Sequence, residues 1–232
     1  KGLDASHLGA LSTEAVSHLN AHQVQALGTD QIQTLGTAQV QAFGNTQLRA
    51  LTTGQVAALT SAEWQALSTD QVRAFAVSQV AALTTTQLHG ASTDQLRALD
   101  AAQVVALSTD IMADLSSDQM SAWTSRQVAA MTTTQVAAFD PTAITALDTG
   151  AMKGLTSAQV AAFTTAQVHA LTTDQIQAFS MRQVGSFETQ DLNAMTTDQI
   201  VAFTSDEVAA LSNAQMSHLG TTQLAAIETD DV

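Results

Sequence analysis

One feature constrains this chain more than any other: an eight-residue repeat that runs from end to end without a change of register. The segment 67–74, LSTDQVRA, is a representative copy. Residues whose numbers are multiples of eight are large and apolar in all 29 copies. The residues at 3, 11, 19 and onward are large and apolar in every copy except at Ala91. Such regularity indicates a fold in which each repeat contacts mainly its neighbours.

Each octad carries the signals of a helix start. In the octad 68–75 we call Ser68 the cap position, Gln71 the glutamine position, Val72 the valine position and Phe75 the leucine position. The cap position holds Ser, Thr, Asp, Asn or Gly, the residues that favour a helix N-cap, in all but three copies. Gln follows three residues later in 20 of 29 copies, which completes a capping box, and the apolar residues on either side have the spacing of a hydrophobic staple. The sequence therefore predicts a capped helix in every octad, with caps that include Ser68, Thr84, Asp140 and Thr172.

A single long helix is excluded by its rotation of about 100° per residue, because an apolar stripe of period eight would wind around the rod. Pro141 and glycines at cap positions such as Gly28 would also interrupt it. A β-solenoid is the main rival, but the apolar positions do not alternate, and the abundant Ala and Gln are helix formers. Pro141 follows a cap residue and so falls at the first helical position. The chain must bend once in each octad.

The predicted fold is an all-α solenoid or superhelix of about 29 short capped helices around a filled apolar core. A side of about 12 Å per octad favours about four to five octads per coil. Alanine before the leucine position would let successive coils approach closely. No linker interrupts residues 1–232, so we expect one domain, and the register at both ends indicates a segment of a longer array. The predicted core includes Leu67, Val72, Phe75, Val80 and Leu83.

Composition argues against several function classes. The net charge is −14, whereas nucleic-acid binding needs clustered Lys and Arg, so no nucleic-acid partner is expected. The chain has no cysteine, which removes disulfides and thiolate sites and suits a protein exported unfolded. No apolar run approaches the 18 residues that a membrane helix requires, so membrane insertion is not expected.

Residues that resemble parts of metal-binding or catalytic sites have simpler structural explanations in this sequence. His18 and His22 have metal-ligand spacing for one helix, but the cap residue Asn20 separates them into successive helices. Aspartates near the helix starts suit the helix dipole, and no calcium loop is present. Ser, His and Asp occur without a nucleophile elbow or a phosphate loop, and the rows of Thr have the wrong spacing for ice binding. We therefore expect no enzyme activity, metal or cofactor.

Phrases such as LTTDQI at 171–176 and LTSAQV at 155–160 are informative as a set. They resemble the octapeptide-repeat tracts of very large secreted or surface-attached proteobacterial proteins described as RTX-like or adhesin-like. The resemblance covers the whole chain and implies export, an extended array and a mechanical or adhesive context. It carries over no functional residue.

The resulting expectation is a structural stalk or spacer in an exported or cell-surface bacterial protein, whose main partners are its own neighbouring repeats. The alternative is an adhesion module that binds a cell-surface protein or glycan. Its sites would then lie in the irregular segments 108–123 and 139–155, where Gln is replaced.

Overall fold

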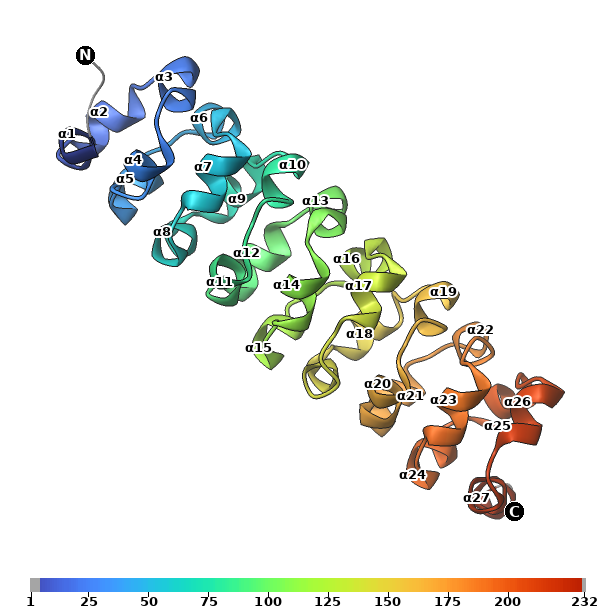
Figure 1. Ribbon diagram of the computed structural model, residues 1–232. Coiled ribbons are helices and arrows are strands. Elements are labelled where there is room, and N and C mark those ends of the chain that lie inside the picture. The colour runs from blue at the N-terminus through green and yellow to red at the C-terminus, as the bar shows by residue number, and fades with distance from the viewer. Residues whose placement is uncertain (1–4, 231–232) are drawn as a thin grey trace. The chain divides into compact units, whose positions relative to one another are not determined.

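The protein is described here by a computed structural model that covers residues 5–230. These residues form 27 short α-helices and one 3₁₀ helix, with no strand among them (Figure 1). The all-α prediction is therefore confirmed. The chain divides into two compact units, Lys1–Ile111 and Met112–Val232, and each is described by itself. Whether they form the single domain expected from the sequence stays a prediction.

The helices follow one another at intervals of one octad. Up to the boundary they are α1 Ala5–Gly9, α2 Thr13–Ser17, α3 Ala21–Gln25, α4 Thr29–Ile32, α5 Thr37–Gln41, α6 Asn45–Ala50, α7 Thr53–Ala58, α8 Ser61–Ala66, α9 Thr69–Ala74, α10 Val77–Val80, α11 Thr85–His89, α12 Thr93–Ala98, α13 Ala101–Ala106 and α14 Thr109–Ala113, which contains the boundary. The others are α15 Ser117–Met120, α16 Ser125–Ala130, α17 Thr133–Ala137, η1 Ala143–Ala146, α18 Thr149–Met152, α19 Ser157–Val160, α20 Thr165–Ala170, α21 Thr173–Gln177, α22 Met181–Val184, α23 Thr189–Ala194, α24 Thr197–Val201, α25 Ser205–Ala209, α26 Asn213–His218 and α27 Thr221–Asp230.

Two extended residues make each corner, as the passage from α8 to α9 shows. Leu67 ends α8 with φ −65° and ψ 138°, and Ser68 follows with φ −72° and ψ 161°. The Leu67 N–H still donates to the Trp64 carbonyl (3.1 Å), and the Val72 N–H donates to the Ser68 carbonyl (2.9 Å). No residue of the described chain has a positive φ, so the corner needs no glycine. This backbone explains why Ser and Thr can occupy the cap position throughout.

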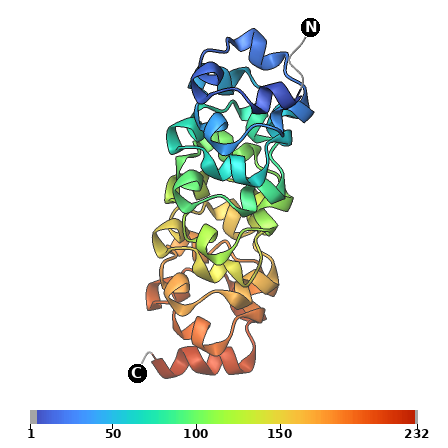
Figure 2. The same ribbon diagram turned by 90° about the vertical axis from the view of Figure 1, so that its left-hand side faces the viewer.

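Within each unit, the helices that pack together are three elements apart in sequence. Figure 1 shows α5, α8 and α11 following one another along one side of the first unit, and Figure 2 shows the same winding from another direction. Hydrogen bonds between coils join residues 25 to 31 positions apart, which is just over three octads and just under four. The expected four to five octads per coil is therefore wrong.

The two large apolar positions of an octad differ slightly in burial. The valine position lies deepest, with Val72 0% exposed, whereas the leucine position lies at the corner, with Leu67 4% exposed. The alanines before the corner are small enough to let coils approach, and Ala74 and Ala98 are buried. Both large apolar side chains of an octad therefore belong to the interior, and the valine position is the less exposed of the two.

Two octads depart from the predicted pattern. In the octad that begins at Asp140, Pro141 and Thr142 form a turn and only the 3₁₀ helix η1 follows, so Pro141 does not open an α-helix as expected. At the other end, α27 continues through position 228 without a corner. Glu occupies that cap position in the sequence. A helix start in every octad was therefore too general a prediction.

A substitution at Gly154 can test how closely successive coils approach one another. This glycine takes the place of the usual alanine before the corner, and a Cβ there would lie 2.5 Å from the Ser125 carbonyl oxygen and 2.7 Å from the Ser125 Cα. We expect Gly154→Ala to lower the free energy of unfolding by about 1–3 kcal/mol, since backbone atoms must move. Gly90→Ala is the control, because a Cβ there meets chiefly the movable end of the Gln65 side chain. Urea unfolding of both variants makes the comparison, and equal losses would contradict the close approach.

Candidate functional site: the glutamine ladders

The capping boxes form the local part of the site. In the octad of α9, the Gln71 N–H donates to Ser68 Oγ (3.2 Å), and the Ser68 N–H donates to Gln71 Oε1 (2.9 Å). Thr84 and Thr172 make the same reciprocal pair with the glutamines three residues later. Each pair satisfies two N–H groups that a helix start leaves without a partner.

The other end of the glutamine side chain makes the contact between coils. With Oε1 occupied by the cap N–H, Nε2 points to the previous coil and donates to carbonyls 31 and 28 residues earlier. Gln55 Nε2 donates in this way to the Val24 carbonyl (2.8 Å) and the Leu27 carbonyl (2.7 Å). In these octads the acceptors stand at a valine and a leucine position, and some of the glutamines, such as Gln55, also reach the residue after the valine position. We call this set the inner ladder. It includes Gln39, Gln47, Gln55, Gln79, Gln87, Gln95, Gln103, Gln159, Gln167, Gln175, Gln183, Gln199 and Gln223.

A second set of donors lies nearer the surface, at the position after the valine position. Gln41 Nε2 donates to the Ala66 carbonyl (2.8 Å) and Arg49 Nε donates to the Ala74 carbonyl (3.0 Å), each 25 residues later. His169 Nδ1 lies 2.9 Å from the Ala194 carbonyl oxygen. We call these contacts the outer ladder. The two ladders bond an octad to the coil before it and to the coil after it.

Inside the ladders lies the apolar core. Leu67, Val72, Phe75, Val80 and Leu83 are all buried. The Phe75 ring packs against the Trp64 indole with 5.3 Å between ring centroids. The core is therefore continuous from one octad to the next in this part of the chain.

Asp140 caps its segment in a different way from Ser68. Its Oδ1 accepts hydrogen bonds from the Thr142 hydroxyl, the Thr142 N–H (2.7 Å) and the Ala143 N–H (3.2 Å). These hydrogen bonds hold the pKa of the Asp140 carboxyl below its ordinary value, and the bond from the Thr142 hydroxyl has the largest effect. Ala143 stands at the glutamine position, so no side chain returns to the cap, and the segment forms a turn and a 3₁₀ helix. Ala151 also lacks the amide, yet α18 is an α-helix, so the missing amide does not by itself account for the 3₁₀ helix.

The inner ladder is interrupted where another residue occupies the glutamine position. Ala143 and Ala151 carry no donor at all, and both are buried. Glu63 and Asp191 bring carboxyl groups into the same buried position. Burial raises the pKa of both carboxyls, against hydrogen bonds from Thr60 and Thr165 that lower it.

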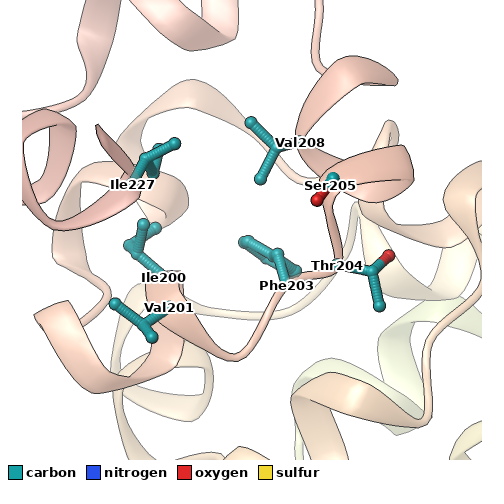
Figure 3. A pocket seen from close by; sticks show the side chains of 7 residues that line it. All are labelled: Ile200, Val201, Phe203, Thr204, Ser205, Val208 and Ile227. Atoms are coloured by element: carbon teal, nitrogen blue, oxygen red, sulfur yellow. The ribbon is translucent and has the colours of Figure 1, made fainter. Parts of the chain in front are cut away.

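The candidate chemical residues of the sequence can now be placed in the described part of the chain. The described residues contain no cluster of three metal-ligating side chains, and His18 and His22 belong to the end of α2 and to α3. A cavity of about 320 Å³ lies beside α24, α25 and α27. In Figure 3 the apolar side chains of Ile200, Phe203, Val208 and Ile227 surround it, and hydroxyls at Thr204 and Ser205 are its polar groups. Nothing in this lining forms a nucleophile with a base.

Sequence reasoning missed the bond between coils, although the signal was present. A capping box accepts Glu as readily as Gln, because either side chain can accept from the cap N–H. The repeat uses Gln in 20 copies and Glu only at Glu63 and Glu207. An amide can accept from the cap and also donate elsewhere, whereas an ionised carboxylate can only accept, so this preference indicates a second partner.

The cap and the core can be separated by a pair of neighbouring substitutions. We expect Leu67→Ala to lower the free energy of unfolding by about 2–5 kcal/mol, because it empties a buried corner. Ser68→Ala removes one capping bond and should lower it by about 0.5–2 kcal/mol. Chemical denaturation followed by circular dichroism measures both. Equal losses would place Leu67 outside the core.

Comparisons with known proteins agree with the repeat. A family model described as the ALTTAQ repeat matches residues 2–37, 32–61, 142–181 and 184–221, which together make more than half of the chain. No curated protein sequence matches this chain. No helix of the described residues is long and apolar enough to cross a membrane. With its octads, capped helices and ladders, the chain belongs to the ALTTAQ repeat family.

Proposed function

We propose that this chain is a structural repeat module, a stalk or spacer of a large exported or surface-attached bacterial protein. The observation that carries the proposal is the inner ladder. The glutamine is the most frequent buried polar residue of the repeat, and both ends of its amide bind the chain's own backbone. In Gln55, for example, Oε1 accepts from the N–H of the cap residue and Nε2 donates to a carbonyl of the previous coil. An amide bonded at both ends is not available to bind a ligand, and its hydrogen bonds stabilise the packing of successive coils.

The spacing of the ladders also suits a spacer. Contacts between coils join octads three or four apart, and packed helices are three elements apart within each unit. In such a quasi-one-dimensional array, whole octads can be added without rebuilding the rest. We propose that the principal partners are the neighbouring repeats and that the chain has no enzyme activity.

The surface supports an exported setting. A net charge of −14 makes separate copies repel one another and favours solubility. The absence of cysteine removes the risk of wrong disulfides during export into an oxidising compartment. Both features suit a long array outside the cell.

Small-angle scattering tests the spacer. Duplicating residues 156–187, which are four whole octads, should leave the helical spectrum unchanged. It should lengthen the particle by roughly one coil, about 8–10 Å. A radius of gyration that grows only as expected for a compact globule would contradict the proposal.

The exported location is tested separately in the full-length protein. An epitope tag within this chain should be labelled by antibody on intact cells. Labelling only after lysis would contradict an exported position.

The second candidate function is an adhesion module, and one observation favours its location. The inner ladder loses its donor twice in succession, at Ala143 and Ala151, within the irregular segment 139–155. Backbone that lacks these bonds could open to a surface protein or glycan. Glycan-array and pull-down binding that saturates, and that the double variant Ala143→Gln/Ala151→Gln abolishes, would favour this candidate over the spacer.

A further inference from the structure

Three acids of the described chain, Glu63, Asp191 and Glu207, stand where the inner ladder needs a donor, and two of them have a buried oxygen without a hydrogen-bond partner. Glu63 of α8 and Asp191 of α23 both occupy the glutamine position and are 2% and 1% exposed. Glu63 Oε2 accepts from the Thr60 N–H (2.6 Å), as a glutamine Oε1 does. Its other oxygen, Oε1, is buried and has no hydrogen-bond partner in the structure. In the neighbouring octads the corresponding atom is a nitrogen that donates to the previous coil.

The register of the ladder indicates what faces the unpartnered oxygen. Counting back 31 and 28 residues from Glu63 gives Ile32 and Leu35, again a valine and a leucine position. Carbonyl oxygens there would accept from a glutamine. An ionised carboxylate has no hydrogen to give them, but a protonated carboxyl has one. Since the oxygen is buried, a proton on the carboxyl is the smallest change that restores the bond.

Asp191 repeats the situation in the second unit with a shorter side chain. Its Oδ1 accepts from the Thr165 hydroxyl (2.8 Å), which belongs to the previous coil. Its Oδ2 is buried without a partner, as Glu63 Oε1 is. The ladder register places Val160 and Phe163 at 31 and 28 residues earlier. Each unit therefore contains one buried acid in its inner ladder with one oxygen unused.

We propose that Glu63 and Asp191 are proton-operated links between successive coils. Each carboxyl, when protonated, donates the inter-coil hydrogen bond that glutamine donates in other octads, and each loses that bond when ionised. Acidification would thus complete the ladder at these two positions. At neutral pH each ionised acid would leave a weak point in its unit.

Burial supports this reading, since it raises the pKa of both carboxyls, and the charge of Glu188 raises that of Asp191 further. Other titratable groups lie on the packed elements. Helix α8 packs against α5, which has none, and against α11, which ends in His89. Helix α23 packs against α20 and α26, which carry His169 and His218. Any test must therefore compare variants that keep these histidines.

The direction of the effect follows from the raised pKa. An acid whose pKa is higher in the folded chain than in the unfolded chain, where glutamate has a pKa of about 4.3, binds protons preferentially in the folded state. Its stabilising contribution is complete at low pH and is lost as the pH rises through the folded pKa. Glu63→Gln and Asp191→Asn abolish this loss. Both variants should melt at higher temperature than the parent at pH 7, and the differences should vanish near pH 4.

Melting of the whole chain from pH 4 to pH 8, followed by circular dichroism, makes the test. The reverse variant Gln55→Glu is the matched control, because it puts an acid into an intact part of the same ladder. It should melt below the parent at pH 7 and approach it in acid. Parallel melting curves for the parent and Glu63→Gln would overturn the proposal. So would a Glu63 carboxyl that titrates, by carbon NMR, at or below the ordinary glutamate value.

Discussion

Removing the four residues Thr133–Val136 is expected to destroy cooperative folding of the second unit, whereas removing the octad 132–139 should lower the melting temperature only modestly. The ladder register explains the difference. Gln159 Nε2 donates to the carbonyls of Val128 and Met131, both at 2.7 Å. Deleting the whole octad brings Met120 and Trp123 to the same separations, which again are a valine and a leucine position.

Deleting half an octad instead brings Thr124 and Gln127 to those separations. They are a cap residue and a ladder residue at the start of α16, so the acceptors at the end of a helix are lost. The downstream apolar positions also fall out of phase with the coil before them. Calorimetry of the two deletion variants decides the matter. If the half-octad variant melts as cooperatively as the whole-octad variant, the register between coils does not hold the fold.

The helices themselves could be predicted from sequence because their signals are local. Ser68, Gln71 and the staple residues Leu67 and Val72 lie within six positions of one another and specify one helix start. The same locality explains the errors. A cap residue such as Asp140 predicts a helix from its own side chain, but Pro141 and Thr142 form a turn there and a 3₁₀ helix follows.

The number of octads in a coil could not be predicted in the same way. It depends on the sequence separation at which the donors of one octad lie close to the carbonyls of the previous coil. That distance is set by contacts 25 to 31 residues apart, such as those of Gln41 and Gln39. Repeats that are nearly identical carry no information on which copy pairs with which. The geometry therefore had to come from the structure.

Gln167 is the most deeply buried glutamine of the inner ladder, with 0% of its surface exposed. Its Oε1 accepts from the Thr164 N–H (2.9 Å), and its Nε2 donates to the carbonyls of Val136 (3.0 Å) and Phe139 (2.7 Å). We expect Gln167→Leu to lower the free energy of unfolding by about 3–6 kcal/mol, because each buried polar group that loses its partner costs about 1–3 kcal/mol. Urea titration of the purified chain measures the loss.

Two further variants separate the roles of that amide. Gln167→Glu keeps the acceptor for the Thr164 N–H, removes the donor to the previous coil and places a carboxyl group in a buried position, so at pH 7 its loss combines the inter-coil bond with the cost of burying that group. Gln177→Leu, on the exposed surface of α21, makes the same chemical change as Gln167→Leu without the ladder and should stay within about 0.5 kcal/mol of the parent. If Gln167→Glu were as stable as the parent at pH 7, the capping box alone would account for the glutamine. A loss in Gln167→Glu that falls on acidification, when the carboxyl can again donate to the previous coil, would assign the difference to the missing donor and the buried charge.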